Sequence, residues 1–162
     1  MSSFSDWLRN FRDLHDRARR GTLKAGEETS YLAARDELAR AMLAAQRLTL
    51  KPWEKARRKL RVARALQLDL ELDGSSQRTM TLDVSVGGFS AMLARAPVVG
   101  DLARISLRLP ATDPLACVAR ITDVKPQDGS VRVAAQFVDL GPADLERLEL
   151  FVVDAVLAML TG

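Results

Sequence analysis

Apolar side chains recur every three to four positions near the start of the chain, the spacing that lines one face of a helix. Ser3 or Ser5 can cap a helix over residues 4–20, and Gly21 stands where a helix commonly ends. Residues 27–48 are rich in Ala, Leu, Arg and Glu, which favour helix. The pattern predicts a helical hairpin with apolar stripes at Phe4, Trp7, Leu8, Phe11 and Leu14 and at Leu32, Leu38, Met42 and Ala45.

The apolar period changes to two after residue 64, which indicates half-buried strands. Leu66, Leu68, Leu70 and Leu72 alternate with polar residues, and a turn is expected at residues 73–76. Short strand patterns separated by turn-rich loops then predict a small closed or nearly closed antiparallel barrel. The further strands are expected at Arg78–Val84, Gly88–Leu93, Leu102–Leu109, Leu115–Val124 and Val131–Val138.

A last helical stripe runs from Gly141 to Leu160, with Pro142 at or near its first turn. The fold class is therefore predicted to be α+β: a six-stranded antiparallel β-barrel with a C-terminal helix and an N-terminal helical extension. We expect three parts along the chain. These are the helical hairpin over residues 1–50, a basic linker over residues 51–64, and the barrel with its helix over residues 65–162.

Charge is distributed unevenly between these parts. Residues 1–64 hold 16 Lys and Arg against 8 Asp and Glu, while residues 65–162 hold 8 against 13. Seven of the basic residues lie between Lys51 and Arg64, opposed there only by Glu54. Such a local positive field attracts phosphate, so a nucleotide, a nucleic acid or an acidic protein surface are all suitable partners.

Composition excludes several classes of function. The 162 residues contain no apolar run near the roughly 20 residues needed to span a bilayer and no N-terminal signal pattern, so we expect a soluble cytoplasmic protein without membrane insertion. One Cys and one His supply neither a disulfide nor a zinc ligand set, and no cofactor is expected. We interpret His15 as a solvated helix residue and Cys117 as a small core residue rather than a nucleophile, and we do not expect an enzyme.

Two arginines stand four positions apart in the basic linker. Arg57 and Arg61 are candidate clamps, because a guanidinium fork can grip a phosphate or the O6/N7 edge of guanine with two parallel hydrogen bonds. Arg58 is given a supporting role. The alternative is a solvated basic linker without a ligand. Trp53, just upstream, could stack on a base, although packing of the linker onto the barrel is the favoured interpretation.

The polar turn at residues 83–88 is the second candidate site. Asp83 and Ser85 are two apart on a predicted strand and should therefore point to one face, where Asp83 can accept hydrogen bonds from guanine N–H groups. Gly87 and Gly88 permit positive φ and close approach of a ligand to the backbone. The alternative is an ordinary strand end, in which the Asp and Ser side chains bond to their own backbone.

Together, RxxxR (Arg57, Arg61) and DxSxxG (Asp83, Ser85, Gly88) resemble the two-part signature of PilZ domains, which bind the bacterial messenger cyclic di-GMP. The resemblance covers about residues 52–162 and implies the same six-stranded barrel followed by a helix. It also implies that the arginines bind the phosphates and guanines of the ligand, and that Asp83, Ser85 and Gly88 form the guanine-facing floor of the site.

The resulting hypothesis is a cyclic di-GMP receptor that changes a protein–protein interaction when the ligand binds. The linker is expected to fold over the ligand and to reposition the helical hairpin, with an unidentified protein partner or a homodimer formed through the N-terminal helices. One alternative is a ligand-independent adaptor or oligomerisation protein with the same fold. Non-specific nucleic-acid binding by the basic segment is a weaker third alternative.

Overall fold

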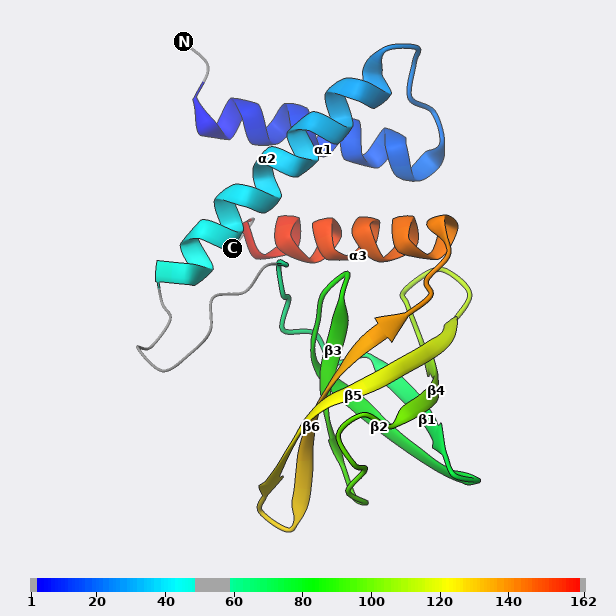
Figure 1. Ribbon diagram of the computed structural model, residues 1–162. Helices are drawn as coiled ribbons and strands as arrows, with labels where there is room; N and C mark the ends of the chain where they lie inside the picture. Colours follow the sequence, from blue (N-terminus) through cyan, green and yellow to red (C-terminus); the bar gives the residue numbers. More distant parts are fainter. Residues whose placement is uncertain (1–2, 49–58, 161–162) are drawn as a thin grey trace. The chain divides into compact units, whose positions relative to one another are not determined.

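The computed structural model describes residues 3–48 and 59–160. The described residues form two compact units, one comprising residues 3–48, 59–60 and 157–160 and the other residues 61–156. The first unit contains the N-terminal helices α1 and α2, and the second contains a β-barrel and most of a C-terminal helix, α3 (Figure 1).

The first unit is built around the predicted helical hairpin. α1 spans Phe4–Arg20 and α2 spans Glu27–Leu48. Ser3 caps α1 in a reciprocal capping box with Asp6, and Gly21 ends the helix with a φ of 70°, so the stop and start signals in the sequence are confirmed. At the start of α2, the Glu27 carboxylate accepts hydrogen bonds from Arg17 at 2.5 Å and from the Lys24 amide at 2.8 Å, which lower its pKa.

His15 is buried, and its interpretation as a solvated side chain was wrong. Only 1% of its surface is exposed, and its Nδ1 lies 2.7 Å from the Tyr31 hydroxyl on α2. His15 is four residues after Phe11 and therefore continues the apolar stripe of α1, where the rings of Phe11, His15 and Tyr31 lie against one another. The hydrogen bond to a hydroxyl on α2 offsets the cost of burying the polar ring. No sequence pattern within α1 reveals that partner.

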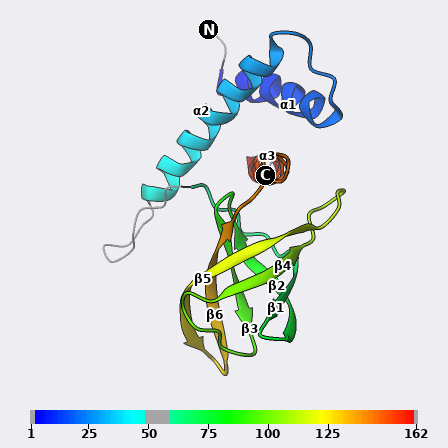
Figure 2. The same cartoon turned by 45° about the vertical axis from the view of Figure 1, so that its right-hand side comes forward.

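The second unit is a closed antiparallel barrel with the strand order β1-β2-β3-β6-β5-β4, in which β4 pairs with β1. It confirms the predicted fold class. Figures 1 and 2 show the barrel from two directions, with α3 lying across one of its ends. The strands are β1 Gln67–Leu72, β2 Ser75–Val84, β3 Gly88–Leu93, β4 Leu102–Leu107, β5 Leu115–Gln127 and β6 Ser130–Val138.

Two hairpins are longer than the sequence pattern predicted. Asp73-Gly74 and Asp128-Gly129 all have positive φ and form two-residue turns, the type whose twist matches that of the flanking strands. Residues that were expected outside the strands, including Ser75 and Ser130, therefore pair within the sheet. The Asp-Gly signal marks the centre of each turn, whereas the wider cluster of polar residues around it belongs to the strands.

The barrel interior is filled by the alternating apolar residues of its strands. Leu68 and Leu70 from β1, Leu93 from β3 and Ile121 from β5 are at most 1% exposed. α3 spans Pro142–Leu160 and adds a fully buried Leu148. Cys117 on β5 is half-buried, and burial together with the nearby Asp144 carboxylate raises its pKa to about 11, so the thiol stays protonated at neutral pH. None of the helices in the described ranges has the length and apolarity to cross a membrane.

Candidate functional site

The segment just before β1 is attached to the end of β2. Val62 and Val84 exchange two backbone hydrogen bonds, of 2.9 and 3.0 Å, and both side chains are buried. In this antiparallel pair Arg61 and Asp83 each precede the paired valine, so they lie diagonally across it on the face opposite the valines. The long side chain of Arg61 reaches Asp83 across that diagonal. Backbone pairing thus brings together one residue from each of the two sequence motifs.

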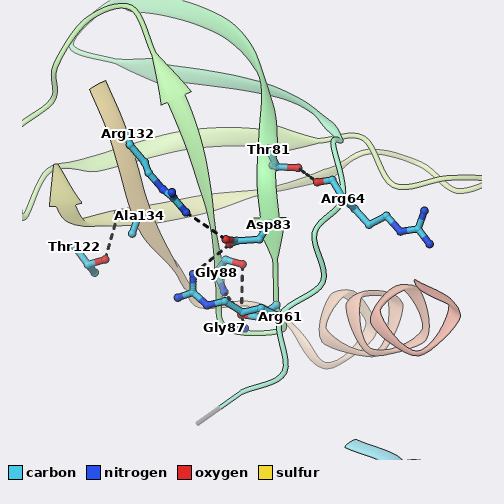
Figure 3. A network of polar contacts seen from close by, with 10 residues as sticks. Arg61, Arg64, Thr81, Asp83, Gly87, Gly88, Thr122, Arg132 and Ala134 are labelled. Carbon is cyan, nitrogen blue, oxygen red and sulfur yellow. Dashed lines mark hydrogen bonds and ion pairs between the residues drawn. The ribbon is translucent and has the colours of Figure 1, made fainter. Parts of the chain in front are cut away.

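Thr81 holds the same segment a few residues further along. Its hydroxyl donates to the carbonyl oxygen of Arg64 at 2.6 Å and accepts from the amide of Leu66 at 2.8 Å. The side chain of Arg64 points away from Asp83 and donates to the carbonyl oxygen of Ala155 on α3 at 3.5 Å (Figure 3). The backbone from Arg61 to Leu66 is therefore fixed to the barrel by β2, while Arg64 itself contacts α3.

A β-bulge turns Asp83 towards the outside of the barrel. The register between β2 and β3 shifts between Thr81, which pairs with Ala91, and Asp83, which pairs with Ser90. Ala91 and Ser90 are adjacent and face opposite sides of the sheet, so Thr81 and Asp83 do as well. Regular alternation would have placed both on the same face. The bulge is therefore what makes the Asp83 carboxylate available at the surface.

The Asp83 carboxylate lies between two guanidinium groups. Arg61 Nη1 donates to Oδ1 at 3.2 Å, and Nη2 of Arg132 on β6 lies 3.8 Å from Oδ2. Figure 3 shows both arginine side chains pointing towards the carboxylate. The side chain of Asp83 is 15% exposed, against 36% for Arg61 and 47% for Arg132. A ligand that carries both phosphate and N–H groups can replace these contacts, because its N–H groups can bind the carboxylate while its phosphates bind the two arginines.

Ser85 lies in the turn rather than on a strand, because β2 ends at Val84. Its hydroxyl accepts from the amides of Gly87 at 3.1 Å and Gly88 at 3.2 Å, and its own amide donates to the carbonyl oxygen of Gly88 at 2.8 Å. The expectation that Ser85 lies on the strand with Asp83 was wrong, since the residue follows the strand and its side chain closes a local turn on the backbone. This turn fixes the backbone immediately beside Asp83.

Gly88 is required by the barrel. A Cβ at this position would lie 3.0 Å from the carbonyl carbon of Ala135 on β6 and closer still to its oxygen. Neither Gly87 nor Gly88 adopts a positive φ. The amide of Phe137, also on β6, donates to the carbonyl oxygen of Gly87 at 2.9 Å. The close approach that the glycine permits is therefore an approach of the turn to strand β6.

Residues 55–154 match the family model of the PilZ domain. The chain belongs to the PilZ domain family. Over 84 residues it is 33% identical to the flagellar brake protein YcgR of Thioalkalivibrio sulfidiphilus, a match that covers 49% of this chain and 34% of that protein. The chain thus spans about a third of the length of this relative.

Solved structures share the fold of this PilZ domain. The PilZ domain of YcgR from Escherichia coli, determined with c-di-GMP, matches 65% of this chain and 95% of that one, with 18% identity and a TM-score of 0.55. The Bacillus subtilis inhibitor of motility MotI matches 67% of this chain and 57% of its own, with 18% identity and a TM-score of 0.58. The K. pneumonia MrkH–c-di-GMP complex matches 67% and 56%, with the same identity and TM-score.

The described part of this PilZ domain contains most of the residues predicted for the site. Arg61, Asp83 and the turn at residues 85–88 are brought together. Arg57 and Arg58 lie outside the described residues, as does Trp53, and the roles assigned to them stay predictions. The assignment of all these residues to ligand binding likewise stays a prediction.

Two neighbours of Asp83 were missed by the sequence reasoning. Arg132 lies on β6 and approaches Asp83 across β3, and Ser90 is the direct cross-strand partner of Asp83. Strand periodicity could have placed Arg132 on the outer face of its strand. It could not have shown that β6 lies next to β3, because that neighbour relation depends on the order of strands in the barrel.

Proposed function

We propose that this PilZ domain is a receptor for cyclic di-GMP, binding the ligand at the outer surface around Asp83. The observation that carries the proposal is the meeting of Arg61 and Asp83, one residue from each half of the family signature, beside the turn closed by Ser85. Two neighbouring folds, YcgR from Escherichia coli and MrkH, were determined with c-di-GMP, which supports the same ligand class here.

The groups around Asp83 suit the chemistry of this ligand. A carboxylate can accept the N1–H and 2-amino hydrogens of guanine side by side, and a guanidinium fork can bind a phosphate or the O6/N7 edge. Replacing the Arg61–Asp83 ion pair by hydrogen bonds to the ligand is favourable in free energy. A partly exposed ion pair such as Arg61–Asp83 contributes about 0–1 kcal/mol, whereas each charge-assisted hydrogen bond to a ligand contributes roughly 1.5–3 kcal/mol. Binding requires no catalytic group.

The place of Arg61 in the chain also suits a receptor that changes a protein–protein interaction. Arg61 belongs to the segment that links the helical hairpin to the barrel, and its neighbour Val62 is fixed to β2. A ligand held by Arg61, and by Arg57 and Arg58 as the family resemblance implies, would act on this link. We propose that binding thereby alters the surface that the helices offer to a protein partner.

Replacement of Asp83 by alanine tests the guanine-reading role. The parent protein is expected to prefer cyclic di-GMP to cyclic di-AMP, because adenine lacks the N1–H and 2-amino donors that a carboxylate accepts. Asp83→Ala should weaken binding of the guanine ligand and reduce that preference. Competition titrations with both dinucleotides measure it. Asp69→Ala, which removes a carboxylate paired with Arg78 elsewhere on the barrel, is the matched control and should behave like the parent.

The two other functional hypotheses give different results in the same experiment. A ligand-independent adaptor binds neither dinucleotide. Non-specific nucleic-acid binding gives an affinity for polynucleotides whose logarithm falls steeply with the logarithm of salt concentration. An unchanged preference between the dinucleotides in Asp83→Ala would remove this residue from base recognition.

A homodimer through the N-terminal helices is a further part of the proposal. Phe4 and Leu32 remain 61% and 42% exposed, although the neighbouring Phe11 and Tyr31 are buried. Covering such side chains contributes about 1.5–3 kcal/mol each, and a second copy provides a symmetric apolar surface.

Light scattering on the full chain should give the mass of a dimer, and light scattering on the Phe4→Ser/Leu32→Ser protein should give the mass of a monomer. The control Val98→Ser removes an exposed apolar residue of the barrel and should leave the mass unchanged. A monomeric parent at tens of micromolar contradicts this part.

A further inference from the structure

The outer face of the barrel beside Asp83 carries two more polar residues, Ser90 directly opposite it and Arg132 diagonally from it. Asp83 on β2 pairs with Ser90 on β3, and Ser90 pairs with Ala134 on β6. Directly opposite residues of antiparallel strands share a face, and Arg132 is two residues from Ala134 on that same face. Asp83, Ser90 and Arg132 therefore form one polar group that spans three neighbouring strands.

The hydroxyl of Ser90 is buried and has no hydrogen-bond partner within the part of the chain that the structure describes. Only 2% of the residue is exposed. Buried hydroxyls in folded proteins are nearly always paired, so an exception at one particular place points to a missing partner. The small side chain of Ala134 on one side and Asp83 on the other leave this hydroxyl next to the proposed ligand surface.

Arg132 is placed where strand pairing alone does not favour it. Its direct partners are Met92 on β3 and Lys125 on β5, and like charges directly opposite each other destabilise a sheet. Lys125 is paired with Asp123 at 3.6 Å, and Arg132 faces Asp83 at 3.8 Å, which is longer than a charge-assisted hydrogen bond. The guanidinium is attracted to the carboxylate without being hydrogen-bonded to it in this pair, so it can turn to another anion at small cost.

We propose that Arg132 and Ser90 are ligand-contacting residues of the same site, beyond the two sequence motifs. When a guanine takes the Asp83 carboxylate, the guanidinium of Arg132 binds an anionic or acceptor group of the ligand, either a phosphate oxygen or the O6/N7 edge. Ser90 supplies its hydroxyl to the ligand beside Asp83. This inference rests on the proposed function, because the ligand class is the same.

Titration with cyclic di-GMP of Arg132→Ala and of the control Lys125→Ala tests the arginine. Both changes remove one positive charge from opposite positions of the β5–β6 pair, but only Arg132 faces Asp83. Arg132→Ala should raise Kd about tenfold or more, since charge-assisted bonds to the ligand are lost. Lys125→Ala should stay within about twofold of the parent. Arg132→Lys keeps the charge without the planar fork and should recover only part of the loss.

Ser90→Ala separates a ligand contact from a structural role. Removal of a buried, unpaired hydroxyl should leave the Tm of the ligand-free protein unchanged or raise it. If Ser90 contacts the ligand, Kd should nevertheless rise by about threefold to tenfold. A lower Tm together with parent-like affinity would show that the hydroxyl serves the fold and would overturn its assignment.

A double variant separates ligand contact by Arg132 from mere positioning of Asp83. If Arg132 acts only through Asp83, the Asp83→Ala/Arg132→Ala protein should bind as Asp83→Ala does; a direct contact predicts further weakening of several-fold. The inference for Arg132 is overturned if the double variant binds as tightly as Asp83→Ala, or if Arg132→Ala binds as tightly as the parent. If in that case Arg61→Ala still weakens binding, the proposed function stands. A parent protein that does not bind cyclic di-GMP overturns both.

Discussion

Replacement of Gly88 by alanine is expected to lower the free energy of unfolding by about 3 kcal/mol, the upper range for overpacking in a closely packed region. The added methyl group would overlap the backbone carbonyl of Ala135, which cannot rotate away as a flexible side chain could. β3 and β6 are paired through this region, so relief of the overlap requires the two strands to separate locally. Urea denaturation followed by circular dichroism measures the change.

Gly141→Ala is the matched control. A Cβ at Gly141 meets nothing within 4 Å, so the same substitution should change stability by no more than about 1 kcal/mol. Equal stabilities of the Gly88→Ala protein and the parent would contradict the packing described here. A loss of ligand binding in Gly88→Ala should therefore be interpreted together with its stability, because the glycine is needed by the barrel itself.

Arg61→Ala is expected to weaken binding of cyclic di-GMP by about 1.5–3 kcal/mol, or roughly tenfold to 150-fold in Kd. The guanidinium lies beside Asp83 and would make charge-assisted hydrogen bonds to the ligand. Stability should change by no more than about 1 kcal/mol, because the side chain is 36% exposed and such ion pairs contribute little. Isothermal titration calorimetry gives the affinity, and Arg57→Ala should show a similar loss.

Arg78→Ala provides the control for this loss. Arg78 also forms an ion pair with an aspartate of the barrel, Asp69, at 2.8 Å, so the substitution removes the same charge and the same kind of contact elsewhere. Its affinity should equal that of the parent. If Arg61→Ala and Arg78→Ala bind equally well, the assignment of Arg61 as a ligand clamp is wrong.

The sequence was sufficient for the helices, the strands and the fold class because the relevant signals are local, whereas the order of the strands in the barrel was not predicted. The leucines of β1 alternate strictly, and α3 begins at Pro142 and ends at Leu160 as its apolar stripe indicates. The hairpin turns were located by the turn-rich stretches around them. Their lengths were overestimated, since composition does not distinguish a polar turn residue such as Ser75 from a polar strand residue.

The site could be predicted only in part, because its geometry depends on contacts between distant segments. The bulge before Asp83 reverses the face that strand alternation assigns to this residue, and no residue type announces it. The burial of His15 depends on a hydroxyl from another helix. Arg132 reaches Asp83 only because β6 is the neighbour of β3 in the barrel. For His15 and for Arg132 the deciding partner is more than ten residues away in sequence.

An NMR titration of the full chain with cyclic di-GMP decides whether the ligand binds at Asp83, since it reports both binding and its location. We expect saturable shifts of the backbone amide signals of Asp83, of the turn at residues 85–88 and of Ser90, together with a shift of the Arg61 side-chain Nε–H signal. Signals of Asp69, Arg78 and Arg104, which line a cavity of about 520 Å³ elsewhere on the barrel, should stay in place. If the spectrum is unchanged at saturating ligand, or if the shifts are confined to that cavity, the protein does not bind cyclic di-GMP at Asp83.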